Sequence, residues 1–160
     1  MRTEILRLLE KNARLTDGEI ATALGVSESE VRAEIAALRE SGIIRGYKCV
    51  IDRAAVDRDA VSANIEVKLT PKAGLGFDEV AEQIAAYPQV DAVYLMSGSC
   101  DLLVTVSGKS FREVASFVAE ELAVIDSVTG TATQFIMRRY KEFGVTLFGD
   151  EDDGRSKLSL

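Results

Sequence analysis

Apolar positions in the first 42 residues recur every three to four residues, which is the period of amphipathic helices. The period predicts one helix over residues 3–12, a second that begins at Thr16 and ends at Gly25, and a third that begins at Ser27 and ends at Gly42. Three short helices in succession, with a glycine turn between the last two, indicate a helix-turn-helix unit.

The residue types at the helix starts and in the turn support this unit. The last two helices each begin with a hydroxyl residue followed three positions later by glutamate, the spacing of a capping box; the pairs are Thr16 with Glu19 and Ser27 with Glu30. Ala21 is small enough for two helices to cross closely, and Gly25 can adopt the left-handed backbone that a side chain would strain. Val31 then closes the small core from the third helix.

After residue 42 the helical period stops. The segment IIRGYKCVID predicts a strand or a wing, and the following DRAAVDRD predicts a polar linker. From residue 61 the pattern gives the order βαββαβ, which is the ferredoxin-like plan. The sequence therefore predicts an α+β protein with a helix-turn-helix domain and linker strand over residues 1–50 and a ferredoxin-like domain over residues 61–138. Residues 139–160 are predicted to form a short strand and a mobile acidic tail.

The second predicted domain contains four strands and two helices. The strands are ANIEVKLT, VDAVYLM, LLVTV and VTGTATQFIMRR, and the helices are FDEVAEQIAAY and FREVASFVAEEL. The positions expected to face inward are Ile65, Val67 and Leu69 in the first strand and Val80, Ala81 and Ile84 in the first helix. Two helices cover one face of such a sheet, so the other face is expected to be uncovered.

Composition limits the function. The 160 residues contain neither a secretory signal nor an apolar stretch of about 18 residues, which predicts a cytoplasmic protein without membrane association. The chain has no histidine, and its two cysteines, Cys49 and Cys100, make neither a disulfide framework nor a zinc cluster. We therefore predict no metal, no cofactor and no enzymatic activity, although the composition alone leaves a carboxylate-only enzyme open.

The net charge of −7 is unevenly distributed. Residues 1–50 hold 8 basic and 8 acidic side chains, whereas residues 51–138 hold 7 basic and 13 acidic ones. The overall field of such a protein repels nucleic acid. Any contact with DNA must therefore come from a local basic surface in the first fifty residues.

The polar segment SGSC interrupts two apolar strands at residues 97–100. As a plain hairpin turn, it would use the φ freedom of Gly98, and the flanking hydroxyls would cap free backbone groups. As a binding site, Asp101 and the turn amides would take the ammonium and carboxylate groups of an amino acid. Both interpretations fit the residues.

Taken together, the helix-turn-helix, the IIRGYKCVID linker, the βαββαβ domain and SGSCDLLV at its central hairpin resemble the Lrp/AsnC family of leucine-responsive and asparagine-activated regulators. The resemblance covers residues 1 to about 140 and implies a RAM/ACT-like second domain. The family's glycine–x–tyrosine–aspartate motif falls on residues 98–101, where Cys100 replaces the tyrosine. The effector-binding residues that the resemblance implies are Ser97, Gly98, Cys100, Asp101, Thr131 and Thr133; for the two threonines, plain strand residues are an equal alternative.

The predicted DNA contacts lie on and after the third helix. They are Ser27, Ser29, Arg32, Arg39 and Arg45, with Arg32 assigned to a guanine and Arg39 and Arg45 to phosphates. The alternative for these charges is a solvated helix face. Family members usually carry an arginine before the isoleucine of this helix, whereas here Glu34 precedes Ile35, and Glu28, Glu30 and Glu34 are expected on its exposed face.

The resemblance also implies partners. It predicts double-stranded DNA, a small-molecule effector of the amino-acid type, and a homodimer formed through the sheet that assembles into tetramers or octamers with effector sites between dimers. One alternative is a ligand-sensing assembly protein whose helix-turn-helix no longer binds DNA specifically. Another is an enzyme similar to sirohaem decarboxylases, which are expected to use histidines that this chain lacks.

Overall fold

The computed structural model describes residues 1–70 and 76–147. The chain divides into two compact units, Met1–Val50 and Ile51–Leu160. Within the described residues, no helix combines the length and apolar character that crossing a membrane requires.

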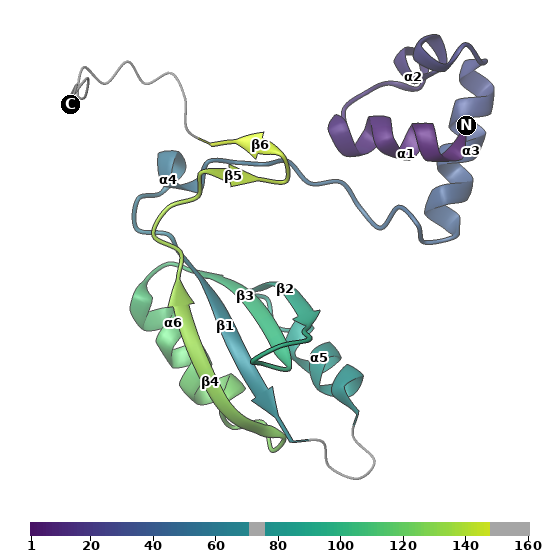
Figure 1. The fold of residues 1–160 in the computed structure, drawn as a ribbon. Coiled ribbons are helices and arrows are strands. Elements are labelled where there is room, and N and C mark those ends of the chain that lie inside the picture. Colours follow the sequence, from purple (N-terminus) through teal and green to yellow (C-terminus); the bar gives the residue numbers. More distant parts are fainter. Residues whose placement is uncertain (71–75, 148–160) are drawn as a thin grey trace, which may run out of the picture. The chain divides into compact units, whose positions relative to one another are not determined.

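The first unit consists of three helices, α1 (Arg2–Lys11), α2 (Asp17–Leu24) and α3 (Glu28–Glu40) (Figure 1). Both predicted capping boxes are present: each hydroxyl accepts from the glutamate amide while the glutamate accepts from the cap amide. Gly25 ends α2 with φ of +68°, in the left-handed region. The predicted helix-turn-helix is confirmed.

Apolar side chains from all three helices form the core of this unit. The buried members are Ile5, Leu9, Ile20, Ala21, Val31 and Leu38. Ala21 and Val31 hold the positions that the sequence assigned to them, since both are buried between the helices. Burying each of the larger aliphatic side chains contributes about 1.5–3 kcal/mol, which is how such short helices remain folded.

The segment that joins the two units differs from its prediction. Residues 43–52 form no strand, and α4 (Arg53–Val56) is a four-residue helix where a polar linker was predicted. The Asp52 side chain starts α4 by accepting a hydrogen bond of 3.1 Å from the Ala54 amide. A strand needs a neighbouring backbone to bond with, and no strand within residues 1–70 and 76–147 pairs with residues 43–52.

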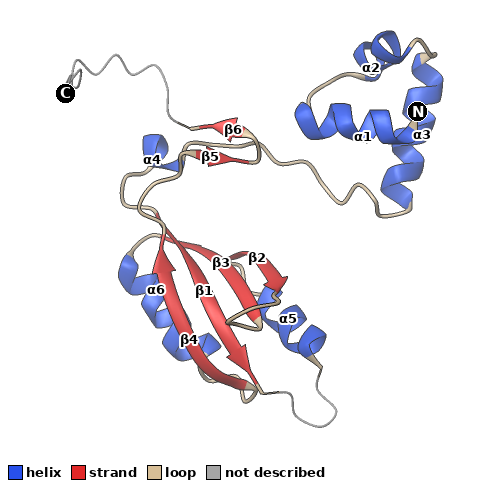
Figure 2. Ribbon diagram, viewed as in Figure 1, coloured by secondary structure: helices blue, strands red, loops and turns tan. Residues whose placement is uncertain are grey.

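The second unit has the predicted order βαββαβ. Its elements are β1 (Val61–Leu69), α5 (Phe77–Ala85), β2 (Val90–Leu95), β3 (Leu102–Gly108), α6 (Phe111–Phe117) with a π-helical continuation (Val118–Leu122), and β4 (Val128–Phe135). The strands pair in the antiparallel order β2-β3-β1-β4 (Figure 2).

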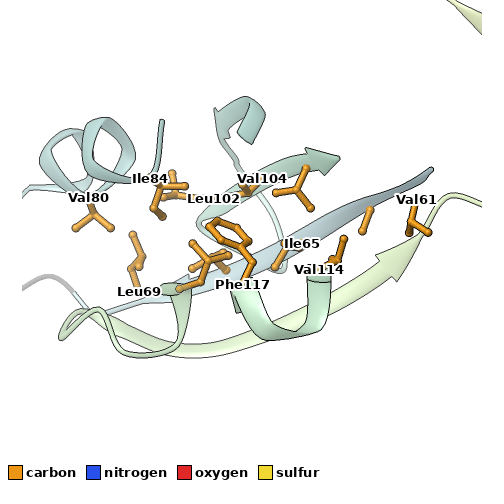
Figure 3. Packing of buried hydrophobic residues seen from close by; sticks show 13 residues of the cluster. Val61, Ile65, Leu69, Val80, Ile84, Leu102, Val104, Val114 and Phe117 are labelled. Atoms are coloured by element: carbon orange, nitrogen blue, oxygen red, sulfur yellow. The ribbon is translucent and has the colours of Figure 1, made fainter. Parts of the chain in front are cut away.

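One face of this sheet is covered by helices. Alternate residues of β1 and β3 point toward α5 and α6 and form a single core, part of which Figure 3 shows. Its members include Ala63, Ile65, Val67, Leu69, Val80, Ile84, Leu102, Val104, Val106, Val114 and Phe117. The predicted inward positions are confirmed, with Ala81 half-buried against the same core.

The opposite face of the sheet is uncovered, as expected, and mainly polar. The Thr105 hydroxyl donates to Asn64 Oδ1 at 3.0 Å, and the Gln134 amide donates to Glu66 Oε1 at 2.9 Å. These pairs join neighbouring strands across the face and satisfy one another's polar groups.

A two-strand hairpin follows the sheet. It consists of β5 (Lys141–Glu142) and β6 (Val145–Thr146), joined by a turn in which Phe143 and Gly144 both have positive φ. Two central residues with positive φ are the geometry of a type I′ turn. The single predicted strand is therefore one arm of a hairpin, and the predicted acidic tail lies in residues 148–160, outside the described residues.

Candidate DNA-binding and effector sites

The outward face of α3 is the candidate DNA-binding surface. Val31 and Leu38 are buried and Ile35 is half-buried, so the helix packs through these positions. The exposed side chains are Glu28, Ser29, Glu30, Arg32, Ala33, Ala36, Arg39 and Glu40. The two alanines were not predicted as part of the site, but small side chains there allow the helix backbone to approach a groove closely, and a methyl group can contact thymine.

The Ser27 side chain serves as the N-cap of α3. Its hydroxyl accepts from the Glu30 amide at 3.3 Å and donates to Glu30 Oε2 at 2.6 Å. These hydrogen bonds, first that of the Ser27 hydroxyl and then that of its amide, lower the pKa of Glu30 below the usual glutamate value. The Ser29 hydroxyl lies 3.0 Å from that of Ser27, so the cap also orients the second predicted serine.

Arg32 is paired with two carboxylates. Its Nε donates to Asp17 Oδ2 at 3.1 Å, and its Nη2 donates to Glu28 Oε1 at 2.5 Å. Asp17 is the first residue of α2 and Glu28 the first of α3, so these pairs tie together the starts of both helices. The side chain of Arg32 nevertheless remains 66% exposed.

Glu34 does not lie on the exposed face, and that prediction is wrong. Its carboxylate accepts from Arg2 Nε at 2.5 Å, and its side chain is only 19% exposed. The reason is helical geometry, because position 34 lies beside Val31, Ile35 and Leu38 on the packed side of α3. The acidic residue is therefore neutralised by α1 instead of being presented to DNA.

Arg39 and Arg45 are both exposed, and neither forms an ion pair within the described residues. The guanidinium of Arg45 lies against Gly42, where an added Cβ would be 3.0 Å from Arg45 Cζ. Gly42 has φ of +72° and follows α3, so the turn places Arg45 back beside the end of this helix. These two arginines have the exposure that phosphate contacts require.

The predicted effector residues begin in the loop between β2 and β3. The Met96 amide donates to the Asp101 carbonyl at 2.8 Å and closes the loop. Asp101 also binds β1 twice: its amide donates to the Val67 carbonyl at 3.0 Å, and its Oδ2 accepts from the Leu69 amide at 2.7 Å. The carboxylate therefore anchors the loop to the end of β1.

Two expectations for the turn residues are wrong. Gly98 does not have positive φ, and a Cβ there would meet nothing within 4 Å, so the turn does not use glycine's conformational freedom. The exposed hydroxyls of Ser97 and Ser99 cap no backbone group in the part of the chain that the structure describes. The loop is held by Asp101 and the strand ends, and its tip is left exposed.

Cys100 and the two threonines turn toward the interior. Cys100 is 7% exposed, whereas Cys49 is exposed. Thr131 pairs with Val67 and Thr133 with Ile65, so both hydroxyl side chains lie on the helix-covered face, half-buried. Thr131 shares the same row of the sheet as Leu102, next to Asp101, at two strand spacings or about 10 Å.

A hollow that the sequence did not indicate lies near the same end of the domain. It has a volume of about 290 Å³ and is lined by Glu79, Val80, Gln83, Val124, Ile125, Asp126 and Ser127. None of the predicted effector residues lines it. The periodicity of α5 predicts only its packed side and gives no signal for a hollow against the segment before β4.

Comparisons with known proteins agree with both units. A family model described as the Lrp/AsnC ligand binding domain matches residues 62–146, and one described as a winged helix-turn-helix DNA-binding domain matches residues 2–45. The HTH-type transcriptional regulator YugG of Bacillus subtilis is 43% identical over 158 residues, which are 98% of this chain and 95% of YugG.

Solved structures show the same fold. The crystal structure of MtbAldR aligns with a TM-score of 0.76 and 27% identity, over 88% of this chain and 94% of that one. The transcriptional regulator NMB0573 from Neisseria meningitidis, described in complex with L-Met, aligns with a TM-score of 0.71 and 23% identity, over 88% of this chain and 90% of that one.

Proposed function

The chain belongs to the Lrp/AsnC family of DNA-binding transcriptional regulators, and from this premise we propose that it responds to an amino acid or similar small metabolite bound at the β2–β3 loop between dimers. Membership identifies a regulator with a ligand-binding domain, not an enzyme, so the sirohaem-decarboxylase and carboxylate-only alternatives are set aside.

The anchoring of Asp101 is the observation that carries this proposal. One oxygen of its carboxylate is used by the Leu69 amide, and the other remains to accept from an ammonium group. The exposed turn at residues 97–99 brings backbone amides close to this acid, which suits the carboxylate end of the same ligand. NMB0573, described with bound L-Met, is an instance of this fold accommodating a free amino acid.

Because the tip of the loop is exposed, a neighbouring subunit supplies the rest of an enclosed site in this proposal. In this proposal the homodimer forms through the uncovered sheet face, and dimers meet at their loops to form tetramers or octamers. A ligand that favours one assembly then changes how many DNA-binding units face the duplex.

A panel of amino acids tests the effector site. Thermal unfolding and sizing chromatography of the full chain with each amino acid should reveal at least one that shifts both. The variant Asp101→Asn keeps an acceptor for the Leu69 amide and removes the charge, so it should fold normally and lose the response. Asp78→Asn, an exposed acid on α5, should keep it. A retained response in Asp101→Asn would contradict the site.

For DNA, we propose that Ser29, Arg32, Arg39 and Arg45 make the contacts, with Ser27 orienting Ser29 through its cap. A gel shift against the region upstream of the protein's own gene tests this assignment. Arg32→Ala should abolish the specific shift and leave the oligomer size unchanged. A wild-type chain that shifts no duplex at low salt would contradict it.

A further inference from the structure

We infer that Asp17 and Glu28 are specificity-determining residues, because they compete with a guanine base for the guanidinium of Arg32. This inference rests on the proposed DNA-binding role of Arg32 and adds two residues that the sequence did not assign. It follows from where the two carboxylates lie and from which edges of the guanidinium they occupy.

The carboxylates occupy one edge of the guanidinium. A guanine is bound through its O6 and N7 by two neighbouring donors of one arginine. In the free protein Nε is bonded to Asp17 and Nη2 to Glu28, so the two donors of this edge are already in use. A guanine contact through the Nε–Nη2 edge of Arg32 is therefore an exchange of partners.

The position of the pair fits this exchange. Glu28 lies against the start of α2, since a Cβ on Gly18 would be 3.6 Å from its Oε2. The N-terminal part of a recognition helix contacts base edges, and the preceding helix crosses the phosphate backbone. Both carboxylates thus occupy the part of the unit that docks on DNA, where they also repel phosphates.

The exchange has different consequences for different sequences. On a duplex without the matching base, Arg32 stays with its carboxylates, and removing them changes little beyond general repulsion. On the matching duplex, guanine bound through the Nε–Nη2 edge requires Arg32 to leave both partners, so the pairs subtract from the affinity. Removing the carboxylates should therefore favour the matching sequence over others.

The test uses the full chain and a duplex selected by the wild-type protein from a random-sequence pool, compared with a scrambled duplex. The double variant D17N/E28Q should bind the selected duplex about fivefold more tightly and the scrambled one less than about twofold more tightly, since exposed ion pairs are individually weak. E40Q removes an exposed charge from the same helix and should change both affinities by the same small factor.

Arg32 itself supplies the second control. In an R32A background the double substitution should no longer discriminate between the two duplexes. Because acids in the first turn stabilise a helix, circular dichroism and the single variants D17N and E28Q check that the fold is retained and that each carboxylate contributes.

Three outcomes would overturn the inference. The first is a lower affinity of D17N/E28Q for the selected duplex, which would mean that the carboxylates pre-orient Arg32. The second is an equal change in affinity for both duplexes. The third is an effect of the double substitution that persists in the R32A background. If the wild type selects no sequence at all, the proposed DNA-binding role fails as well, so the two failures are distinguishable.

Discussion

The ion pair between Arg2 and Glu34 lies on the packed side of α3 and leaves the opposite side exposed. Glu34 is held at 2.5 Å from α1 and is largely covered, whereas Arg32 and Arg39, two and five positions away, are exposed. Replacing Glu34 with the arginine that is usual in the family would put two like charges together under α1. The family's usual residue therefore suits this chain only if its partner changes too.

The variant Glu34→Arg should lower the free energy of unfolding of the first unit by about 1 kcal/mol, since the lost pair is partly exposed and the new charges repel. Urea unfolding followed by the helical signal measures this change. The charge swap R2E/E34R should recover most of the loss. If the swap is no more stable than Glu34→Arg, the pair adds nothing to the apolar packing of α1 against α3.

The two capping glutamates predict an acid sensitivity. Hydrogen bonds from Thr16, its amide first and then its hydroxyl, lower the pKa of Glu19, as those of Ser27 do for Glu30. A folded-state pKa below the unfolded value means that the stabilisation is present above about pH 4.3 and is lost as the pH falls through the folded-state pKa.

An acid titration of the unfolding temperature checks this direction. The wild type should lose stability as the pH falls below about 4.3. The variant E19Q/E30Q, which keeps hydrogen-bonding side chains without the titrating charge, should show a shallower decline over the same range. An equal decline in both proteins would show that other carboxylates cause the acid sensitivity.

At the scale of elements, local signals decide how far the sequence predicts the fold. The capping boxes and the alternation in β1 involve residues within four positions of one another, and these elements occur where predicted. The strand predicted at residues 43–52 is absent because no strand of the described part of the chain pairs with this segment, and its Ile44 packs against the helical core of the first unit instead. The hairpin of β5 and β6 was missed because Phe143, a residue that rarely has positive φ, occupies its turn.

The candidate sites follow the same division. Arg32, Arg39 and the loop before Asp101 are exposed, as the sequence predicts, because the helix and strand periods determine which positions face outward. The distant partners of these residues were not predictable, whereas the pair of Arg32 with Glu28 has the i,i+4 spacing of neighbours on a helix. Arg32 pairs with Asp17 fifteen positions earlier, and Asp101 bonds to Leu69 thirty-two positions earlier. Such contacts depend on how elements pack, which no local pattern encodes.

Two glycines with different backbone conformations give a matched prediction. Gly25→Ala should lower the free energy of unfolding by about 1 kcal/mol, because an L-residue is strained in the left-handed region. Gly98→Ala should leave it unchanged, since φ is not positive there and a Cβ meets nothing. Thermal unfolding of both variants measures the difference. A large loss in Gly98→Ala would contradict the loop geometry described above.

At the scale of the whole molecule, the two units differ in net charge. The chain carries a net charge of −7, and its first fifty residues balance 8 basic against 8 acidic side chains. Arg2 and Arg32 form internal ion pairs, so we expect exposed arginines without such pairs in the described residues, such as Arg39 and Arg45, to dominate the attraction to phosphate. A regulator of this kind attracts DNA through few contacts against an unfavourable overall field.

The salt dependence of DNA binding counts those contacts. If Arg39 of each subunit of a dimer contacts one phosphate, Arg39→Ala removes two contacts. The slope of log affinity against log salt concentration should then become shallower by about 1.8. Fluorescence anisotropy on one duplex over a series of salt concentrations measures the slope. Arg112→Ala, an exposed arginine on α6, should leave it unchanged because that arginine lies outside the DNA-binding unit. An unchanged slope in Arg39→Ala would place the contact elsewhere, and equal changes in both variants would mean that the general charge of the chain, not its helix-turn-helix, sets the attraction.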